Sequence, residues 1–206
     1  MKCLLCSAIF LESASWQKLF LLKQSDVICA KCSAKFEKVQ NNQIENEWSG
    51  TIYEGALDTV NSIYSYNDWM KTVFRQYKFQ LDVELAKIFA DDFKSLRKVQ
   101  ELIVPIPLHP EMLQKRTFAQ VDQLLVAANV PFTHALTKTS NRSRVGKLKK
   151  DRMSAELMFS ISQDVQNKHI LLVDDLYTTG ATLHHAAFVL KTAGASSVRA
   201  ITMIRA

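Results

Sequence analysis

The most constraining feature of the sequence is the run ILLVDDLYTTGAT at residues 170–182. Its first four residues have the length and β-branched content of a strand buried on both faces, as in a parallel sheet covered by helices. Two neighbouring carboxylates, Asp174 and Asp175, follow this apolar run, and a threonine-rich turn around one glycine comes next. We therefore expect the two acids to lie where the strand leaves the core.

A helix is predicted directly after this turn. Apolar residues recur at helical spacing between Leu183 and Ala193, and Gly194 is placed to end the helix. In open parallel sheets, ligands bind beyond the carboxyl ends of the strands, and a helix N-terminus offers free backbone N–H groups to an anion. The turn is therefore predicted to hold a phosphate with its hydroxyls and amides. It consists of Thr178, Thr179, Gly180, Ala181 and Thr182.

The acidic pair has three possible roles at the end of such a strand. Two carboxylates can coordinate Mg²⁺, act as acid and base, or accept hydrogen bonds from vicinal hydroxyls. The phosphate-type turn that follows narrows the choice, because a ligand with a diol at one end and a phosphate a few ångströms away is a ribose 5-phosphate. The sequence thus predicts a sugar-phosphate site between Asp174 and Thr182.

Composition and hydropathy describe a soluble globular chain of 206 residues, 48% of them hydrophobic. The longest apolar stretch near the start, residues 4–11, is interrupted by Cys6 and Ser7 and stopped by Glu12, so it is too short to span a bilayer and is a poor signal peptide. We expect a cytoplasmic protein with no membrane insertion. The domains are predicted as a zinc-binding module at 1–40, a connecting or hood region at 41–100, and an α/β domain at 101–206.

The four cysteines form two CxxC pairs separated by 22 residues. This spacing is typical of a structural zinc site, in which each pair supplies two thiolates to a tetrahedral ion. A disulfide framework is not expected in a cytoplasmic protein, and a redox CxxC would not need a second pair. Because the intervening segment is too short to bury a core, metal binding should supply most of its folding energy. The predicted ligands are Cys3, Cys6, Cys29 and Cys32.

The net charge of +6 is concentrated in one segment. Residues 138–152 hold seven basic side chains and one acid, and the remaining acids and bases balance. Such a run is typical of a mobile loop that meets an anionic partner, although a solvated loop without a ligand has the same composition. Six residues are predicted to contact pyrophosphate or nucleic acid: Arg142, Arg144, Lys147, Lys149, Lys150 and Arg152.

Strands and helices are expected to alternate along most of the chain, which predicts a doubly wound α/β sheet with helices on both faces. Strands are expected within residues 51–66 and at 102–107, 131–136, 157–161, 170–173 and 198–204. Helices are expected at 69–77, 83–93, 110–128 and 183–193. The neighbouring His184 and His185 are predicted on a solvated helix surface, because adjacent helical positions point in different directions.

Residues 170–182 resemble the signature of the phosphoribosyltransferases at every defining position. That signature is a buried strand, two acids, two variable residues and then Thr-Thr-Gly-x-Thr. The resemblance implies a type I phosphoribosyltransferase-like domain that binds phosphoribosyl pyrophosphate together with Mg²⁺. Asp174 and Asp175 would bind the ribose hydroxyls, and residues 178–182 would hold the 5-phosphate. His109, at the end of a segment that looks like the pyrophosphate loop, is a further candidate, and residues 142–152 lie where these enzymes carry a loop that closes over the substrate.

A second resemblance covers nearly the whole chain. The chain is similar to the ComF family of bacterial competence proteins, of the ComFC type, in five features along its length. They are the four-cysteine module, Gln76-Tyr77-Lys78-Phe79, Val104-Pro105-Ile106-Pro107-Leu108, Arg116-Thr117-Phe118-Ala119-Gln120 and the acid–threonine motif. The chain departs from the family pattern at Thr117 and Ala119, where Gly and Asn are usual. The resemblance implies a cytoplasmic role in natural transformation, in handling incoming single-stranded DNA, beside a ComFA-type helicase.

Two hypotheses for function remain open at this point. The first is a DNA-handling protein that uses a phosphoribosyltransferase fold, with its zinc module and basic loop on the nucleic acid backbone. The second is an active phosphoribosyltransferase that transfers ribose 5-phosphate to an unidentified nitrogen nucleophile, and the two can hold together. The sequence assigns no catalytic residue, acceptor or oligomeric state.

Overall fold

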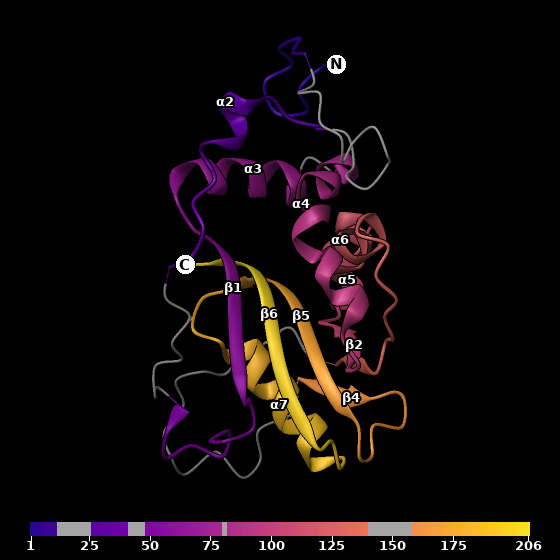
Figure 1. Ribbon diagram of the computed structural model, residues 1–206. Helices are drawn as coiled ribbons and strands as arrows, with labels where there is room; N and C mark the ends of the chain where they lie inside the picture. Colours follow the sequence, from indigo (N-terminus) through magenta and orange to yellow (C-terminus); the bar gives the residue numbers. More distant parts are fainter. Residues whose placement is uncertain (12–25, 41–47, 80–81, 140–157) are drawn as a thin grey trace.

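The computed structural model describes residues 1–11, 26–40, 48–79, 82–139 and 158–206. A sheet of four strands in the order β1-β6-β5-β2 forms its centre (Figure 1). The strands are β1 (Thr59–Ser65), β2 (Leu102–Pro105), β5 (His169–Tyr177) and β6 (Ser197–Arg205). All neighbouring pairs are parallel, so the predicted parallel α/β sheet is confirmed.

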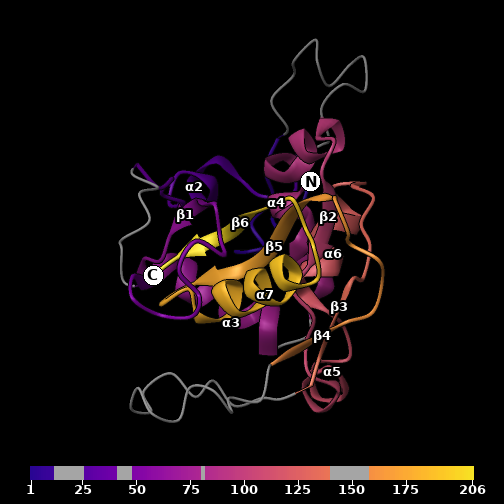
Figure 2. The same ribbon diagram turned by 90° about the horizontal axis from the view of Figure 1, so that it is seen from below.

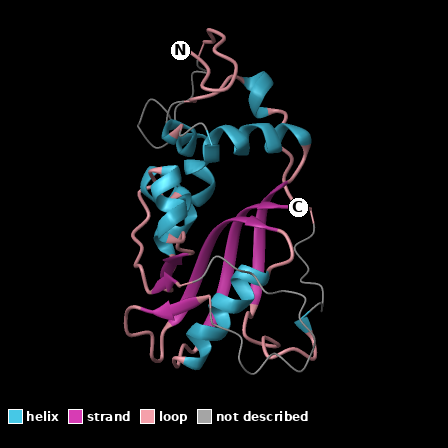
Figure 3. Cartoon of the chain, turned by 180° about the vertical axis from the view of Figure 1, so that it is seen from behind, coloured by secondary structure: helices cyan, strands magenta, loops and turns pink. Residues whose placement is uncertain are grey.

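Strand β5 is buried on both faces, as its apolar run predicts. Ile170 and Leu172 pack on one face with β1, β6 and helix α7 (Ala181–Thr192), whereas Leu171 and Val173 pack on the other. Figures 1 and 3 show α7 crossing one face of the sheet, whereas α3, α4 and α6 do not lie on that face. These three helices, α3 (Asp68–Phe79), α4 (Ala86–Phe93) and α6 (Gln120–Ala127), supply the apolar residues of the second core.

A small antiparallel pair, β3 (Leu136–Lys138) and β4 (Phe159–Ile161), stands apart from the main sheet. It lies with α5 (Pro110–Arg116) on the β2 side of the sheet (Figure 2). The remaining short elements are α2 (Ala30–Ser33) and the 3₁₀ helices η2 (Val83–Leu85) and η3 (Lys94–Lys98). None of the helices in the described residues is long and apolar enough to cross a membrane.

Three expectations about the elements are corrected. The helix predicted at residues 110–128 is two helices, α5 and α6, because Thr117 between them adopts the left-handed conformation with φ of 59°. Strand β5 continues to Tyr177, so the acidic pair lies inside a strand rather than beyond one. The strand expected at residues 131–136 begins only at Leu136, as β3, and it pairs antiparallel with β4 outside the main sheet. Residues 51–66 contribute one strand, β1, as expected, and it pairs with β6 at the edge of the sheet.

The N-terminal cysteine region is fastened to the sheet by the segment that follows it. Residues 38 and 64 form an antiparallel bridge, and Val39 N–H donates to the Ile63 carbonyl at 3.0 Å. The Phe36 ring packs against Tyr64, Trp69 and Phe89, with ring centroids 5.5 to 6.3 Å away. Because Trp69 belongs to α3, this helix contacts the cysteine region near one end.

Candidate functional site

A cavity of about 240 Å³ opens at the carboxyl ends of β2 and β5, and its lining includes the last part of β5. Its lining comes from α3, the loop after β2, α5, the α5–α6 junction, β3, and β5 with its turn. We call the segment 174–182 the acidic wall, and the three basic residues Lys78, Arg116 and Lys138 the cationic wall. The hollow lies where parallel sheets bind ligands, beside the N-terminus of α7.

Both aspartates of the acidic wall are buried and both line the cavity. Asp175 N–H donates to Asp174 Oδ1 at 2.8 Å. Burial, and then the charge of Asp175, raise the pKa of Asp174 to about 7, although this hydrogen bond and the charges of Lys78 and Lys138 oppose the shift. Asp174 can therefore exchange a proton near neutral pH.

The threonine turn follows directly. Gly180 adopts φ of 73° and caps α7, which begins at Ala181. A Cβ atom at Gly180 would lie 2.6 Å from Tyr177 Oη, so this position combines a left-handed backbone with a close approach that only glycine allows. Of the turn residues, Thr178 and Thr182 line the cavity. The Thr179 carbonyl faces elsewhere and accepts a hydrogen bond from Trp48 Nε1 at 3.2 Å.

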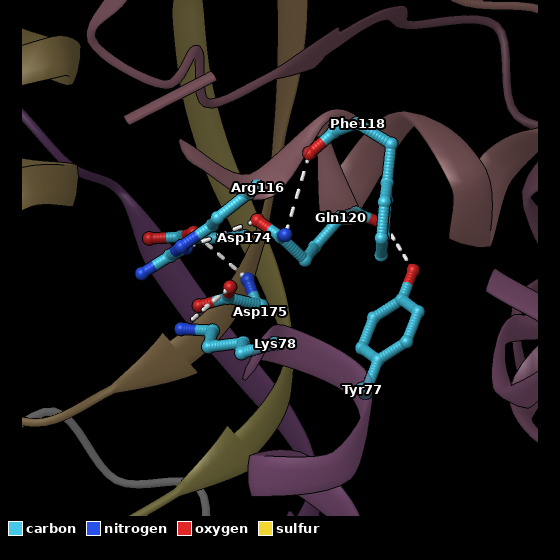
Figure 4. Close-up of polar contacts among 7 residues, drawn as sticks. All are labelled: Tyr77, Lys78, Arg116, Phe118, Gln120, Asp174 and Asp175. Atoms are coloured by element: carbon cyan, nitrogen blue, oxygen red, sulfur yellow. Dashed lines mark hydrogen bonds and ion pairs between the residues drawn. The ribbon is translucent and has the colours of Figure 1, made fainter. Parts of the chain in front are cut away.

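The cationic wall comes from three separate parts of the chain. Lys78 Nζ lies 2.8 Å from Asp175 Oδ2, and Arg116 Nη1 donates to Gln120 Oε1 at 3.0 Å. Figure 4 shows the Lys78 and Arg116 side chains extending toward the two aspartates. Burial lowers the pKa of Lys138, and the charges of Asp174 and Asp175 oppose this shift. Three cations therefore surround two carboxylates, which favours an anionic ligand.

Hydrogen bonds support the cationic wall from behind. The Tyr77 hydroxyl donates to the Gln120 carbonyl at 2.6 Å, and Gln120 Nε2 donates to the Phe118 carbonyl at 3.3 Å. Both contacts are drawn in Figure 4. Tyr77 and Gln120 are almost fully buried, so α3 fixes the α5–α6 junction that carries Arg116.

The other predicted site residues divide into two groups. His109 lines the cavity and caps α5, where its Nδ1 accepts a hydrogen bond from Glu111 N–H at 3.4 Å. The basic segment lies outside the described residues, and with it Arg142, Arg144, Lys147, Lys149, Lys150 and Arg152.

The sequence prediction assigned no site role to Lys78, Arg116 or Lys138. The signals were present, since Lys78 and Arg116 lie in two of the family-like motifs and Lys138 begins the basic run. Nothing in those motifs indicated that their side chains meet the acids, because α3, α5 and β3 approach β5 only through tertiary packing.

The prediction of a solvated histidine pair is wrong. His184 and His185 are 4% and 8% exposed. Trp48 stacks on His184 at a centroid distance of 4.6 Å, and the Tyr53 ring lies 4.1 Å from that of His185, so the segment before β1 covers this side of α7. Burial lowers the pKa of His184 to about 4, which keeps the ring neutral.

The four cysteines gather at a second candidate site. Their Sγ atoms all lie within 4.8 Å of one another, and Cys6 Sγ is 3.8 Å from Cys29 Sγ. Tetrahedral zinc with Zn–S bonds of about 2.3 Å needs sulfurs about 3.8 Å apart, so the residues fit the ion. Burial, and then contacts with the other three cysteines, raise the pKa of Cys32 to about 12. All four sulfurs can therefore ionise together only beside a cation, which a bound metal ion would supply.

Two curated relatives are similar to the chain over nearly their whole length. Competence protein ComFC of Bacillus subtilis is 34% identical over an alignment of 226 positions, which covers 98% of this chain and 94% of the relative. Competence protein ComFC of Streptococcus pneumoniae is also 34% identical, over 220 positions that cover both chains completely. The chain belongs to the ComFC family. A comparison with a domain family agrees with the resemblance to phosphoribosyltransferases noted in the sequence.

The family described as "Phosphoribosyl transferase domain" matches residues 84–206. This ComFC family member therefore carries a phosphoribosyltransferase-type domain that includes β2, β5, α7 and β6. Among solved structures, a hypoxanthine phosphoribosyltransferase of Staphylococcus aureus is 14% identical with a TM-score of 0.38, covering 61% of this chain and 64% of that one. Family membership rests on the sequence matches. Lys78 lies outside the matched segment, yet it reaches the cavity.

Proposed function

We propose that this ComFC family protein works in the cytoplasm during natural transformation, where it handles incoming single-stranded DNA and binds phosphoribosyl pyrophosphate. The observation that carries the proposal is one cavity flanked by two buried aspartates, a threonine turn at a helix N-terminus and three cations. This set has a group for each part of the ligand, the diol, the 5-phosphate and the pyrophosphate.

In the proposed complex, Asp174 and Asp175 accept hydrogen bonds from the ribose hydroxyls, and residues 178–182 hold the 5-phosphate. His109 and the basic segment 142–152 meet the pyrophosphate. Mg²⁺ accompanies the pyrophosphate as its counter-ion.

Calorimetric titration with phosphoribosyl pyrophosphate and Mg²⁺ tests the site. The wild type should bind, and the double variant Asp174→Ala/Asp175→Ala should lose at least tenfold in affinity, about the effect of removing hydrogen bonds to charged groups. A matched control, Asp82→Ala/Glu84→Ala, removes two exposed acids away from the cavity and should bind normally. Equal binding by all three proteins contradicts the proposed site.

The nucleic acid part of the proposal rests on charge. Lys and Arg contacts to phosphates release counter-ions, so affinity should fall steeply with salt, by roughly 0.7 in the logarithmic slope for each contact to a single strand. Neutralising Arg144, Lys147, Lys149 and Lys150 should therefore lower the slope by about 3. A matched variant that loses Lys71, Lys87, Lys94 and Lys98 should keep most of it. An unchanged slope in the first variant argues against the basic segment as the DNA contact.

A ComFA-type helicase is the proposed protein partner, on the family resemblance alone. Co-purification of the two proteins with single-stranded DNA tests this part. Recovery of the helicase with the Asp174→Ala/Asp175→Ala variant at wild-type yield would separate the partner contact from the ligand site.

A second candidate function is transfer of ribose 5-phosphate to a nitrogen nucleophile. It is favoured by Asp174, whose pKa of about 7 suits a group that accepts a proton while the bond from C1 to pyrophosphate breaks and the bond to nitrogen forms. Release of pyrophosphate from phosphoribosyl pyrophosphate, measured with and without single-stranded DNA, tests it. If the protein binds phosphoribosyl pyrophosphate but releases no pyrophosphate with any acceptor, the transfer function is ruled out and only the binding function is supported.

We also propose that the four cysteines hold one structural Zn²⁺. The sulfur spacing and the small size of the module support this assignment. Elemental analysis should find one zinc per chain, and chelation should unfold the region around Cys3 and Cys32, as read by hydrogen exchange. Metal-free protein with full exchange protection there rules the ion out as a structural element.

A further inference from the structure

A buried ion pair joins the two walls of the cavity. The Lys78 and Asp175 side chains are 14% and 12% exposed, and Nζ lies 2.8 Å from Oδ2. The Lys78 ammonium also lies 4.1 Å from the centre of the Phe74 ring. Removing one partner of such a pair leaves a nearly buried charge without compensation, and that is costly.

The same pair stands in the way of the ligand contacts proposed above. A ribose hydroxyl that donates to Asp175 competes with Lys78 for the carboxylate. A sugar phosphate without a diphosphate would take Asp175 and leave the Lys78 charge uncompensated. Free pyrophosphate would attract Lys78 and leave Asp175 in the same condition. We call these two smaller ligands, the sugar phosphate and free pyrophosphate, the half-ligands. Each of them has to break the Lys78–Asp175 ion pair, yet it offers a new partner to only one of the two side chains.

The other cations are less suited to this exchange. Arg116 is tied to Gln120, whose backbone is held by the Tyr77 hydroxyl. Lys138 comes from β3 and, within the described part of the chain, forms no ion pair with either aspartate, although their charges act on it. Lys78 has a flexible four-carbon stem and lies next to the last residue of α3, so its ammonium can move between two partners.

We propose that Lys78 is a specificity-determining residue: it holds Asp175 until a ligand supplies both a vicinal diol for the carboxylate and a diphosphate for the ammonium. The inference rests on the proposed sugar-phosphate site and adds a selection rule to it. The cavity then accepts phosphorylated sugars that carry an anomeric diphosphate, and it disfavours ribose 5-phosphate and pyrophosphate separately. The selecting residue comes from outside the segment that matches the phosphoribosyl transferase domain.

Calorimetry with three probes tests the rule: phosphoribosyl pyrophosphate with Mg²⁺, ribose 5-phosphate, and inorganic pyrophosphate. Lys78→Met should bind phosphoribosyl pyrophosphate about tenfold more weakly and ribose 5-phosphate about tenfold more tightly, because Asp175 is then free. Asp175→Asn should show the opposite preference among the half-ligands, with tighter pyrophosphate and weaker ribose 5-phosphate. Lys71→Met, the same substitution at an exposed position of α3, should match the wild type for all three probes.

Two checks keep the result decisive. Lys78→Arg keeps the positive charge and should keep the wild-type order of the three ligands, and urea unfolding should show that every variant is folded. If Lys78→Met shifts all three ligands in the same direction, or none of them, the selection rule is wrong while the proposed site stands. If the wild type does not bind phosphoribosyl pyrophosphate, the proposed function itself fails, and the selection rule fails with it.

Discussion

The acidic wall of the cavity is one continuous segment, residues 174–182, whereas the cationic wall brings Lys78, Arg116 and Lys138 together from α3, α5 and β3. The first wall is built by a strand, a turn and a helix that follow one another, so local geometry places every group. The second depends on the packing of three elements against β5. A substitution in the acidic wall should therefore change the backbone conformation or the charge of the site directly. A substitution near the cationic wall should change the site indirectly, through the contacts that hold the three cations in place.

The largest expected effect is in the acidic wall and depends on pH. The pKa of Asp174 is about 7 in the fold and near 3.9 in the unfolded chain, so the folded protein binds more protons between these values. This contribution to stability is therefore lost as pH rises from 4 to 7. Asp174→Asn should raise the free energy of unfolding at pH 8 by up to about 4 kcal/mol and should have almost no effect at pH 4.

Urea unfolding of wild type and Asp174→Asn at pH 4, 6 and 8 measures this difference. The asparagine Oδ1 can still accept from the residue 175 N–H, so the backbone contact is retained. A difference between the two proteins that does not change with pH would mean that Asp174 titrates normally.

The next effect concerns the glycine of the turn. Gly180→Ala should cost about 3 kcal/mol, because a left-handed backbone and a contact with Tyr177 Oη act together. Gly55→Ala is a matched control, since Gly55 has φ of 69° and no atom near the added Cβ, and it should cost about 1 kcal/mol. Equal losses for the two variants, measured by urea unfolding, would show that the contact with Tyr177 relaxes freely.

A smaller loss is expected when the support of the cationic wall is removed. Tyr77→Phe deletes the hydrogen bond to the Gln120 carbonyl and leaves that buried acceptor without its donor, at a cost of about 1 to 2 kcal/mol. Tyr66→Phe, at an exposed position, should change stability by less than about 0.5 kcal/mol. If Tyr77→Phe also weakens phosphoribosyl pyrophosphate binding while Tyr66→Phe does not, the junction positions Arg116 as described.

The smallest effects are stabilising and concern the two departures from the family pattern. Thr117 adopts φ of 59°, which strains a β-branched residue, and Ala119 is the N-cap of α6 without a side-chain cap. Thr117→Gly and Ala119→Asn should each stabilise the protein by about 1 kcal/mol in thermal or urea unfolding. Asn129→Gly serves as control, because Asn tolerates its φ of 54° and the gain should be smaller. Destabilisation by both changes would show that the junction needs the residues it has.

Much of this architecture could be read from local patterns. The apolar run 170–173, the last strand and the helix after the turn are as predicted, because their periodicity and capping residues act over a few positions. The cysteine pairs indicated a metal site through spacing alone, and their Sγ atoms do gather. The split between α5 and α6 was missed, since the apolar pattern continues through Thr117 while its backbone turns left-handed.

The sequence by itself determined the apolar strands typical of a parallel α/β sheet, the order of acids and threonines after one of them, and two CxxC pairs, because residues a few positions apart specify each of these. Only the tertiary structure decided that Lys78 pairs with Asp175, that Asp174 is buried enough to raise its pKa, and that Trp48 and Tyr53 cover the two histidines. The physical reason is that charge pairing and desolvation depend on which distant segments pack together, and no local pattern encodes those distances.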